Sequence, residues 1–471
     1  MRFFKTLLAA LAVTMTVSSE AAQLPNIVLV MADDQGWGDM AYNGHPIVKT
    51  PNFDKAAATG LRFDRFYAAA PVCSPTRAAV MTGRHPNRMG VFKWGYPMRP
   101  QETTIAEALK KAGYATGHFG KWHLGSVRRQ SDAHPGVNGF DEFLSAPNFY
   151  DNDPILSHNG KAVPIKGESS VVAAEAALKW MKKNKEKPFL SVVWFGSPHS
   201  PFGAVEQDRK LYDDQPKANQ HFLGEVTGMD RAFGMIRDGL EKMGIRDNTI
   251  LWYTSDNGAL KKVGSAGPFR GLKGQVYEGG LLVPAILEWP KVIEQHRVIT
   301  GRCNSCDIYP TLLEIAGVKL AEQPRLDGIS LVPVINGGEV RRQRPMGFWD
   351  MDQPGIGTPA AAWMKELYEA QLKGEDLPQP AKVPPAAKLP NPKYATDSFP
   401  GNAAWVEGDW KLHRKQDKKG NVTWEFYNLA VDQGETTNLL GTEGQRIHQH
   451  RGKLQKWLAS VVHSLNGEDY Q

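Results

Sequence analysis

The sequence predicts an α/β fold in which helices flank a mostly parallel central sheet. Three short apolar runs, within 25–40, 187–202 and 248–260, each end abruptly in polar residues, as strands that are buried on both faces do. Helical patterns lie between these runs, and such alternation is typical of a parallel sheet covered by helices. Ligands of these sheets bind at the carboxyl ends of the strands, which is where the polar residues fall.

Sequence signals place two of the helices. In the run 103–114, Thr104 and Glu107 have the spacing of a capping box, and Gly113 is a stop signal. The run 169–184, SSVVAAEAALKWMKKN, is the second candidate. Both lie between predicted strands and support the α/β assignment.

A further helix is predicted to begin beside Cys73. Ser74 is a favourable N-cap, Pro75 a favourable first helical residue and Gly83 a stop signal. Cys73 then lies immediately before a helix N-terminus, where free amides and the positive end of the helix dipole favour an anion. A buried structural cysteine is the alternative, but Arg77, one turn into the helix, can reach back toward the same end.

Cys73 is also the odd cysteine of the 3 in the chain. Cys303 and Cys306 have CxxC spacing and could form a disulfide in an oxidising compartment, or they could stay reduced. Without a nearby histidine pair they make a poor zinc site. The unmatched Cys73 is therefore a candidate reactive position.

Residues 1–22 have the pattern of a secretory signal peptide. Arg2 and Lys5 precede an apolar run that is too short to span a bilayer comfortably, and small residues follow it. We predict an exported chain, periplasmic or secreted, without a membrane span. The net charge of +6 is mildly basic and could favour anionic substrates. Because no block of lysine and arginine is visible, we expect no nucleic-acid partner.

The sequence pattern changes after about residue 340. We therefore predict a catalytic domain over 23–340 and a C-terminal subdomain over 341–471. Within the latter, the Pro-rich stretch at about 379–402 predicts an extended surface loop. The run 403–430 alternates around a polar turn, as a β-hairpin does. Six apolar residues between 454 and 465 have helical spacing, so we expect a small antiparallel sheet closed by an amphipathic helix.

Two of the predicted strands end in hard oxygen ligands. Asp33 and Asp34 follow the first strand, and Asp256 and Asn257 follow the strand within 248–260. Such oxygens suit Ca²⁺ or Mg²⁺ and not zinc, which prefers nitrogen and sulfur. Asp and Asn are also common in ordinary turns, which is the alternative for either pair alone.

Cations and histidines occur near these strands as well. Lys121 and His123 are two residues apart, so in an extended segment they point to the same side, and this suits an anionic substrate. His199 lies between two prolines after a predicted strand, and Lys273 lies in a Gly-rich loop close to Asp256. A solvated loop is the alternative for each.

Six motifs together resemble the type I sulfatase family, the formylglycine-dependent branch of the alkaline phosphatase superfamily. In chain order they are NIVLVMADDQGWGD, CSPTRAAVMTG, GYATGHFGKWHLG, SPHSP, SDNG and EFYNLAVDQGETTNL. The resemblance covers nearly the whole predicted mature chain, which resembles arylsulfatases and N-acetylgalactosamine-6-sulfatases. The sequence departs from the usual signature at Thr76, where serine is most common, and the CxxC pair is not a family hallmark.

The resemblance implies that a formylglycine-generating maturation enzyme oxidises Cys73 to formylglycine, whose aldehyde is then hydrated. It implies one Ca²⁺ per chain as the cofactor. The implied ligands are Asp33, Asp34, the modified Cys73, Asp256 and Asn257. Lys121, Lys273 and His199 would add positive charge where the reaction builds negative charge.

The resemblance also implies catalytic roles. One hydroxyl of the hydrated aldehyde attacks sulfur, with Asp256 assisting its deprotonation and Arg77 positioning it. His199 or Lys273 protonates the leaving alcohol. His123 takes the proton of the remaining hydroxyl, which expels sulfate and restores the aldehyde, so covalent catalysis has a built-in release step.

The expected substrate is a sulfated carbohydrate or an aryl sulfate. Specificity is expected from the loop after the first strand, from the loops over 94–104 and 147–160 and from the Pro-rich stretch. Their tryptophans and tyrosines could stack on sugars, and core packing is an equally good explanation for most of them. Two alternatives stay open: a phosphodiester or phosphonate monoester hydrolase of the same superfamily, and a sulfated-glycan binding protein without activity. A two-zinc phosphatase is disfavoured because a second set of metal ligands is not apparent in the sequence.

Overall fold

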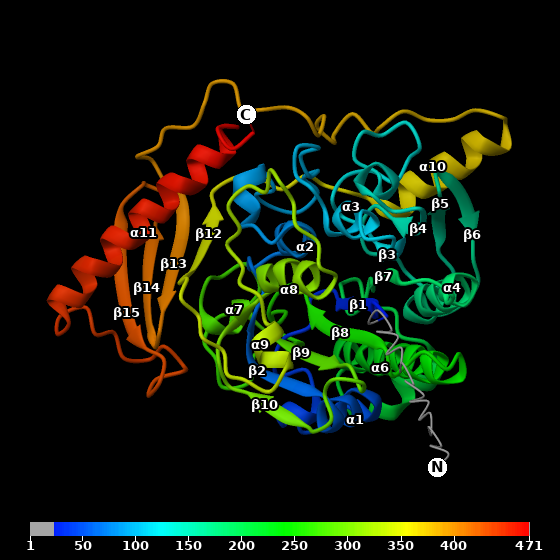
Figure 1. The fold of residues 1–471 in the computed structure, drawn as a ribbon, viewed down its shortest axis with the longest axis horizontal. Coiled ribbons are helices and arrows are strands. Elements are labelled where there is room, and N and C mark those ends of the chain that lie inside the picture. Colours follow the sequence, from blue (N-terminus) through cyan, green and yellow to red (C-terminus); the bar gives the residue numbers. More distant parts are fainter. Residues whose placement is uncertain (1–22, 471) are drawn as a thin grey trace, which may run out of the picture.

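A large mixed sheet forms the centre of the structure, a computed structural model that describes residues 23–470 (Figure 1). The predicted signal peptide, 1–22, lies outside the described residues. Within the described part the sheet has 11 strands, and β11 (Cys303–Asn304) pairs with β2. The others follow the order β10 (Arg297–Ile299), β2 (Leu61–Tyr67), β9 (Leu282–Glu288), β8 (Thr249–Ser255), β1 (Asn26–Ala32), β7 (Phe189–Trp194), β3 (Ala115–Lys121), β4 (Glu142–Ala146), β5 (Ile155–His158) and β6 (Lys161–Pro164).

The three predicted strands are β1, β7 and β8, which are neighbours at the centre of this sheet. β1 runs parallel to both, with Ile27 opposite Leu190 and Ile250. β3 and β4 continue the parallel arrangement beyond β7, whereas β9 and the β5–β6 pair run antiparallel to their neighbours. The predicted α/β fold with a mostly parallel sheet is confirmed, so the carboxyl ends of the central strands meet at one edge.

Helices cover both faces of the sheet. Alternate residues of β1 from Ile27 to Met31 pack with α2, α3 and α8, and those from Val28 to Ala32 pack with α1, α4 and α6. These side chains are at most 3% exposed, and burial of each one larger than alanine stabilises the fold by roughly 1.5–3 kcal/mol. The predicted capping box of Thr104 and Glu107 begins α3. In chain order the helices are α1 (Pro51–Thr59), α2 (Cys73–Thr82), α3 (Ile105–Lys110), α4 (Ser169–Asn184), α5 (Glu206–Arg209), α6 (Lys217–Lys242), α7 (Glu278–Leu281), α8 (Ile308–Ile315), α9 (Val332–Ile335), α10 (Ala360–Leu372) and α11 (Gly444–Leu465).

A second, antiparallel sheet of four strands lies between the large sheet and α11, at the left of Figure 1. Its strands are β12 (Met346–Met351), β13 (Gly401–Glu407), β14 (Trp410–Gln416) and β15 (Val422–Asn428). One face buries Trp405 and Phe426 against α11, and the other packs on Tyr67 and Leu282 of the large sheet. The predicted hairpin is present as β14 and β15, but 403–430 also contains most of β13 and so makes two turns. The predicted C-terminal helix is α11.

Between β12 and β13, two neighbouring strands of the second sheet, the chain returns to the edge of the large sheet. α10 packs beside β5 and β6, where Gln371 donates a hydrogen bond to the Gly160 carbonyl (2.9 Å) and accepts one from the Ala162 amide (2.8 Å). From α10 the chain runs to β13 without helix or strand, across the top of Figure 1. This segment corresponds to the predicted Pro-rich loop, whereas the domain boundary at about 340 stays a prediction.

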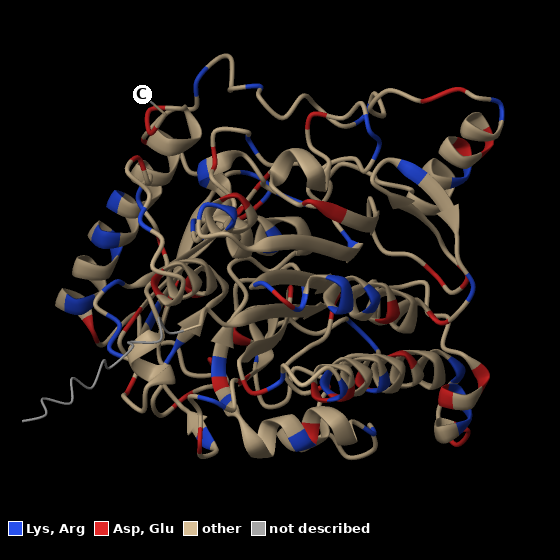
Figure 2. Ribbon diagram, turned by 45° about the vertical axis from the view of Figure 1, so that its right-hand side comes forward, with Lys and Arg blue, Asp and Glu red and all other residues tan. Residues whose placement is uncertain are grey.

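Charged residues of both signs are interspersed over the described elements (Figure 2). Lysine and arginine residues follow one another along α11, where Arg446, Arg451 and Lys453 lie. Within 23–470, no helix has both the length and the apolar character needed to cross a membrane.

A buried ionic network joins the two sheets. Lys411 of β14 donates to Glu278 of α7 (2.7 Å) and lies 3.2 Å from Glu435. Glu435 also pairs with His413 (2.5 Å) and accepts a hydrogen bond from the Glu278 amide (2.7 Å). The side chains of Lys411, His413 and Glu435 are 0% exposed, so the network depends on mutual neutralisation.

We predict that Glu435→Ala lowers the free energy of unfolding by about 3–5 kcal/mol, because it leaves the Lys411 charge buried with one partner fewer. Urea denaturation followed by fluorescence measures this change. The control is Glu443→Ala, which removes an exposed ion pair with Arg446 and should change stability by no more than about 1 kcal/mol. Equal effects of the two substitutions would contradict the prediction.

Candidate active site

The polar residues that follow β1 and β8 form one cluster. Ala32 lies opposite Ser255 in the parallel ladder, so the two strands end at the same level. The Asp34 amide donates to Asp256 Oδ1 (3.0 Å), and Asn257 Nδ2 donates to Asp34 Oδ1 (3.0 Å). The four side chains predicted as metal ligands, Asp33, Asp34, Asp256 and Asn257, are all 0% exposed and lie together.

Three cations pair with the three carboxyl groups of this cluster. Arg77 of α2 donates from Nε and Nη2 to Asp256 Oδ2 (3.1 and 2.6 Å). Lys121, at the end of β3, donates to Asp33 Oδ2 (2.6 Å). Lys273 contacts Asp34, with Nζ 2.5 Å from Oδ1, rather than Asp256, near which the sequence places it.

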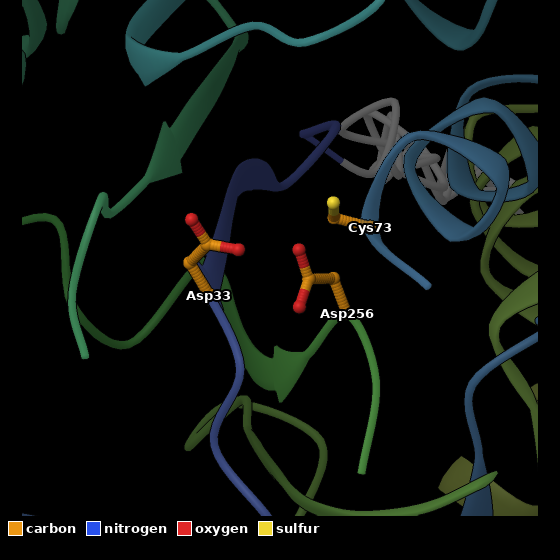
Figure 3. Close-up of side chains that lie close together, drawn as sticks. All are labelled: Asp33, Cys73 and Asp256. Carbon is orange, nitrogen blue, oxygen red and sulfur yellow. The ribbon is translucent and has the colours of Figure 1, made fainter. Parts of the chain in front are cut away.

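Cys73 faces this cluster from the beginning of α2 (Figure 3). Its Sγ and carboxylate oxygens of Asp33 and Asp256 lie within 4.8 Å of one another, and Cys73 is 2% exposed. The prediction that Ser74 is the N-cap is wrong, since the helix begins at Cys73 with Val72 as N-cap. The Ser74 hydroxyl is used elsewhere: it donates to the His123 carbonyl (2.6 Å) and accepts from the Gly95 amide (2.8 Å).

His123 reaches the site by a different route from the one predicted. β3 ends at Lys121, and His123 has a left-handed backbone with φ of 55°, so the two residues do not share an extended segment. The chain turns because the Trp122 amide still pairs with Ala146 while the Trp122 side chain is buried in the core. Both residues nevertheless lie at the site, since Lys121 contacts Asp33 and His123 lines the cavity beside Cys73.

His199 approaches from the loop after β7. Its Nε2 lies 3.5 Å from Asp34 Oδ2, and its ring stacks on Phe149, with ring centroids 4.3 Å apart and planes at 14°. Nδ1 is 2.6 Å from the Ser200 carbonyl oxygen, which requires the Nδ1–H tautomer. Nε2 is therefore the nitrogen that faces the cluster.

A cavity of about 700 Å³ opens beside Cys73. Its size is typical of small-molecule sites. Its lining residues are Cys73, Trp94, His123, Asn148, Phe149, His199, Lys273, Gly357, Thr358, Pro359 and Lys382. The loops predicted for specificity supply Trp94, Asn148, Phe149 and Lys382. The 357–359 stretch was not predicted, and its Gly-Thr-Pro sequence carries no signal that would have distinguished it from an ordinary loop.

The pKa values of Asp33 and Asp34 are shifted in opposite directions by burial and neighbouring charges. Burial raises the pKa of Asp33 to about 8, although Lys121 and Arg77 act to lower it. Burial acts on Asp34 in the same sense, but Lys273 and His199 outweigh it and hold the pKa of Asp34 below its ordinary value. The difference arises because the neighbouring charges of Asp256 and Asp34 add to the effect of burial on Asp33, so that its cations do not outweigh it.

Both histidines are neutral at pH 7. Burial lowers the pKa of His199 to about 4, despite the attraction of Asp34. Burial and the positive charge of Lys121 hold the pKa of His123 well below its ordinary value. Within the described residues, neither ring nitrogen of His123 has a hydrogen-bond partner, so this imidazole is available as a proton acceptor.

Two buried oxygens at the centre of the cluster have no hydrogen-bond partner within 23–470. They are Asp33 Oδ1 and Asn257 Oδ1. Unpaired buried polar atoms are costly, and each is a hard donor of the kind that Ca²⁺ and Mg²⁺ prefer. The residues therefore fit a hard divalent cation.

Together, the fold and the cavity define a class of protein, an α/β enzyme with a cation-rich cavity over the ends of its strands. The chain belongs to the sulfatase family, whose model, Sulfatase, matches residues 25–318. It is 33% identical to mouse (Mus musculus) N-acetylgalactosamine-6-sulfatase over 393 residues, which are 73% of this chain and 72% of that protein. It is 32% identical to dog (Canis lupus familiaris) arylsulfatase G over 375 residues, which are 67% and 68% of the two chains.

The fold is also found in the crystal structure of Ps i-CgsB in complex with k-i-k-neocarrahexaose. The TM-score is 0.77 at 24% identity, with 94% of this chain and 98% of the other covered. The resemblance to sulfatases is confirmed, and this chain is an enzyme of the sulfatase class. The roles of its individual residues belong to the proposal below.

We predict that the three cysteines of the unmodified chain are all free and all unreactive in the folded protein. Each is buried, and burial raises the pKa of each thiol, so little thiolate is present. Titration with Ellman's reagent should find three thiols in denaturant and almost none without it. A denatured count of one would show instead that Cys303 and Cys306 form a disulfide.

Proposed function

We propose that this enzyme removes sulfate from a sulfated carbohydrate or an aryl sulfate, with formylglycine derived from Cys73 as nucleophile. The observation that carries the proposal is the position of Cys73, which begins α2 in a cavity and faces Asp33 and Asp256. The proposal includes oxidation by a maturation enzyme and export to the periplasm or beyond. It also includes the domain division at about residue 340.

Asp33, Asp34, Asp256 and Asn257, with the modified Cys73, would hold one Ca²⁺. When bound, the ion supplies positive charge beside the sulfate, and the hydrated aldehyde supplies an oxygen nucleophile that can later expel sulfate. The free oxygens Asp33 Oδ1 and Asn257 Oδ1 support the ligand set. The donor chemistry suits Mg²⁺ also, and the resemblance favours Ca²⁺.

The three cations orient the carboxyl groups of the cluster and place positive charge beside them. Arg77 holds Asp256 through two hydrogen bonds and so fixes the carboxylate that would assist deprotonation of the nucleophile. Lys121 and Lys273 place their ammonium groups around Asp33 and Asp34. Preorganised positive charge stabilises negative charge that develops on the sulfate oxygens.

The two histidines have separate proton roles. His199 is neutral in the free enzyme, and the negative charge of a bound sulfate ester would raise its pKa, so that Nε2 gains a proton for the leaving alcohol. Lys273 is the alternative donor, but its contact with Asp34 raises its pKa and holds its proton. His123, neutral and without a hydrogen-bond partner among the described residues, would accept the proton when sulfate departs.

We predict faster hydrolysis of 4-nitrophenyl sulfate than of bis(4-nitrophenyl) phosphate when the chain is made with a maturation system. Cys73→Ala should lower the sulfatase rate by at least about 10³-fold because the nucleophile is absent. Mass spectrometry of the tryptic peptide from Phe66 to Arg77 should find the aldehyde in active enzyme. Cys306→Ala is the control and should keep activity.

Faster turnover of the phosphate ester would favour the phosphodiester hydrolase alternative. Binding of sulfated glycans without any turnover would favour the binding-protein alternative. Activity in a protein whose Cys73 is wholly unmodified would refute the proposed nucleophile.

We predict that Ca²⁺ raises the melting temperature of protein stripped with EDTA. A ligand present at 100 times its dissociation constant stabilises the folded state by about 2.7 kcal/mol. Differential scanning calorimetry with and without Ca²⁺ measures the shift. Asn257→Leu, which removes a proposed ligand, should abolish the shift, whereas Glu186→Gln, at an exposed position, should keep it. An equal shift in both variants would place the ion elsewhere.

A further inference from the structure

The outer wall of the Cys73 cavity carries a positive charge that the protein does not neutralise. The lining residues include no aspartate or glutamate, and their two lysines are Lys273 and Lys382. Lys273 is paired with Asp34. Lys382 is exposed. Among residues 23–470, no carboxylate oxygen lies within 4.0 Å of its Nζ, which is the limit for an ion pair. An anion that enters this cavity therefore meets a free ammonium group.

Lys382 is held in place although it belongs to the Pro-rich loop. The neighbouring Val383 and Ala386 are each 4% exposed, so they anchor the segment by burial. The Ala386 amide donates to Asp132 (2.9 Å), and Gln379 donates to the Val383 carbonyl (3.0 Å). These contacts fix the turn that carries Lys382 at the rim of the cavity.

Trp94 forms another part of the same wall. Trp94 is 42% exposed, so much of its large apolar surface is open to contact with a ligand. Its position is fixed, because its carbonyl accepts a hydrogen bond from the Ile356 amide (2.9 Å) and its indole lies against Gly355. A Cβ atom on Gly355 would lie 2.0 Å from Trp94 Cε2. The indole is thus a preformed surface of the kind on which sugar rings stack.

We propose that Trp94 and Lys382 form a subsite for a saccharide that carries a second anionic group besides the scissile sulfate. This inference rests on the proposed function and narrows its substrate class to polyanionic saccharides. Trp94 contacts the sugar ring, and Lys382 binds the second group, a sulfate or a carboxylate. The cavity volume of about 700 Å³ accommodates more than a single sulfate group.

Calorimetric titration of the Ca²⁺-loaded Cys73→Ala protein tests the subsite without turnover. The probes are N-acetylglucosamine 6-sulfate, glucosamine 2-N,6-O-disulfate and the unsaturated chondroitin 6-sulfate disaccharide, which carry one sulfate, two sulfates, and one sulfate with one carboxylate. We expect a probe with a second anion to bind about fivefold more tightly than the monosulfate, as one partly exposed ion pair allows. Preference for the disulfate alone identifies a sulfate as the second group, and preference for the disaccharide alone identifies a carboxylate.

Lys382→Gln in the same background should reduce this affinity ratio to about one, and Lys382→Arg should retain it. Lys388→Gln is the matched control, since Lys388 is exposed in the same loop but lines a different hollow. Trp94→Ala should weaken all three sugars by about tenfold, in keeping with the loss of one aromatic contact.

No preference for either two-anion sugar, or an equal loss of the ratio in Lys382→Gln and Lys388→Gln, overturns the inference. Because these titrations need no catalysis, their result is separate from the aryl sulfate assay. A protein without sulfatase activity can still have the subsite, and an active sulfatase can lack it.

Discussion

Pairing between three buried carboxyl groups and three buried or largely buried cations holds the site together. A carboxylate taken out of water without a partner costs several kcal/mol, so Asp33, Asp34 and Asp256 can be buried side by side only because cations reach them. Each cation comes from a different element: α2, the end of β3, and the Gly-rich loop after β8. The cluster therefore ties these three elements to the ends of β1 and β8.

The C-terminal sheet supports this cluster from a distance. Glu435, whose left-handed backbone has φ of 53°, binds the Glu278 amide through its side chain, and its carbonyl accepts a hydrogen bond from Arg270 (2.9 Å). These two contacts enclose the loop that carries Lys273. Functional groups are most precise when rigid elements hold them. Here Glu435, which is itself held by Lys411 and His413 of the second sheet, braces an otherwise irregular loop. This arrangement explains why the motif EFYNLAVDQGETTNL, which contains Glu435, accompanies the motifs at the strand ends.

Local signals in the sequence predicted the parts of the fold that depend on local physics. The apolar runs identify β1, β7 and β8, the capping box identifies α3, and Gly83 ends α2 with φ of 69°. The sequence could not reveal α6, because four glycines make this helix unfavourable by propensity, at about 1 kcal/mol each. Packing explains them: a Cβ on Gly239 would lie 2.3 Å from Leu178 Cδ2, so the glycine lets α4 and α6 approach. The turn at His123 and the contact of Lys273 with Asp34 are also tertiary effects, which spacing along the chain does not encode.

The charge balance of the cluster bears on what the cavity selects. A carboxylate must be ionised to bind a metal ion. In the cation-loaded cluster Asp33, Asp34 and Asp256 would therefore balance Arg77, Lys121 and Lys273, and the divalent cation would give the cluster an excess of two positive charges. A sulfate ester, with one negative charge, offsets only half of that excess, which leaves the cavity attractive to further negative charge on the same ligand. In the proposed function, the inner cluster recognises the sulfate group that all substrates share. Trp94 and Lys382 lie outside the cluster on separate loops, so exchange of these residues can change the preferred saccharide while the carboxylates and cations stay in place.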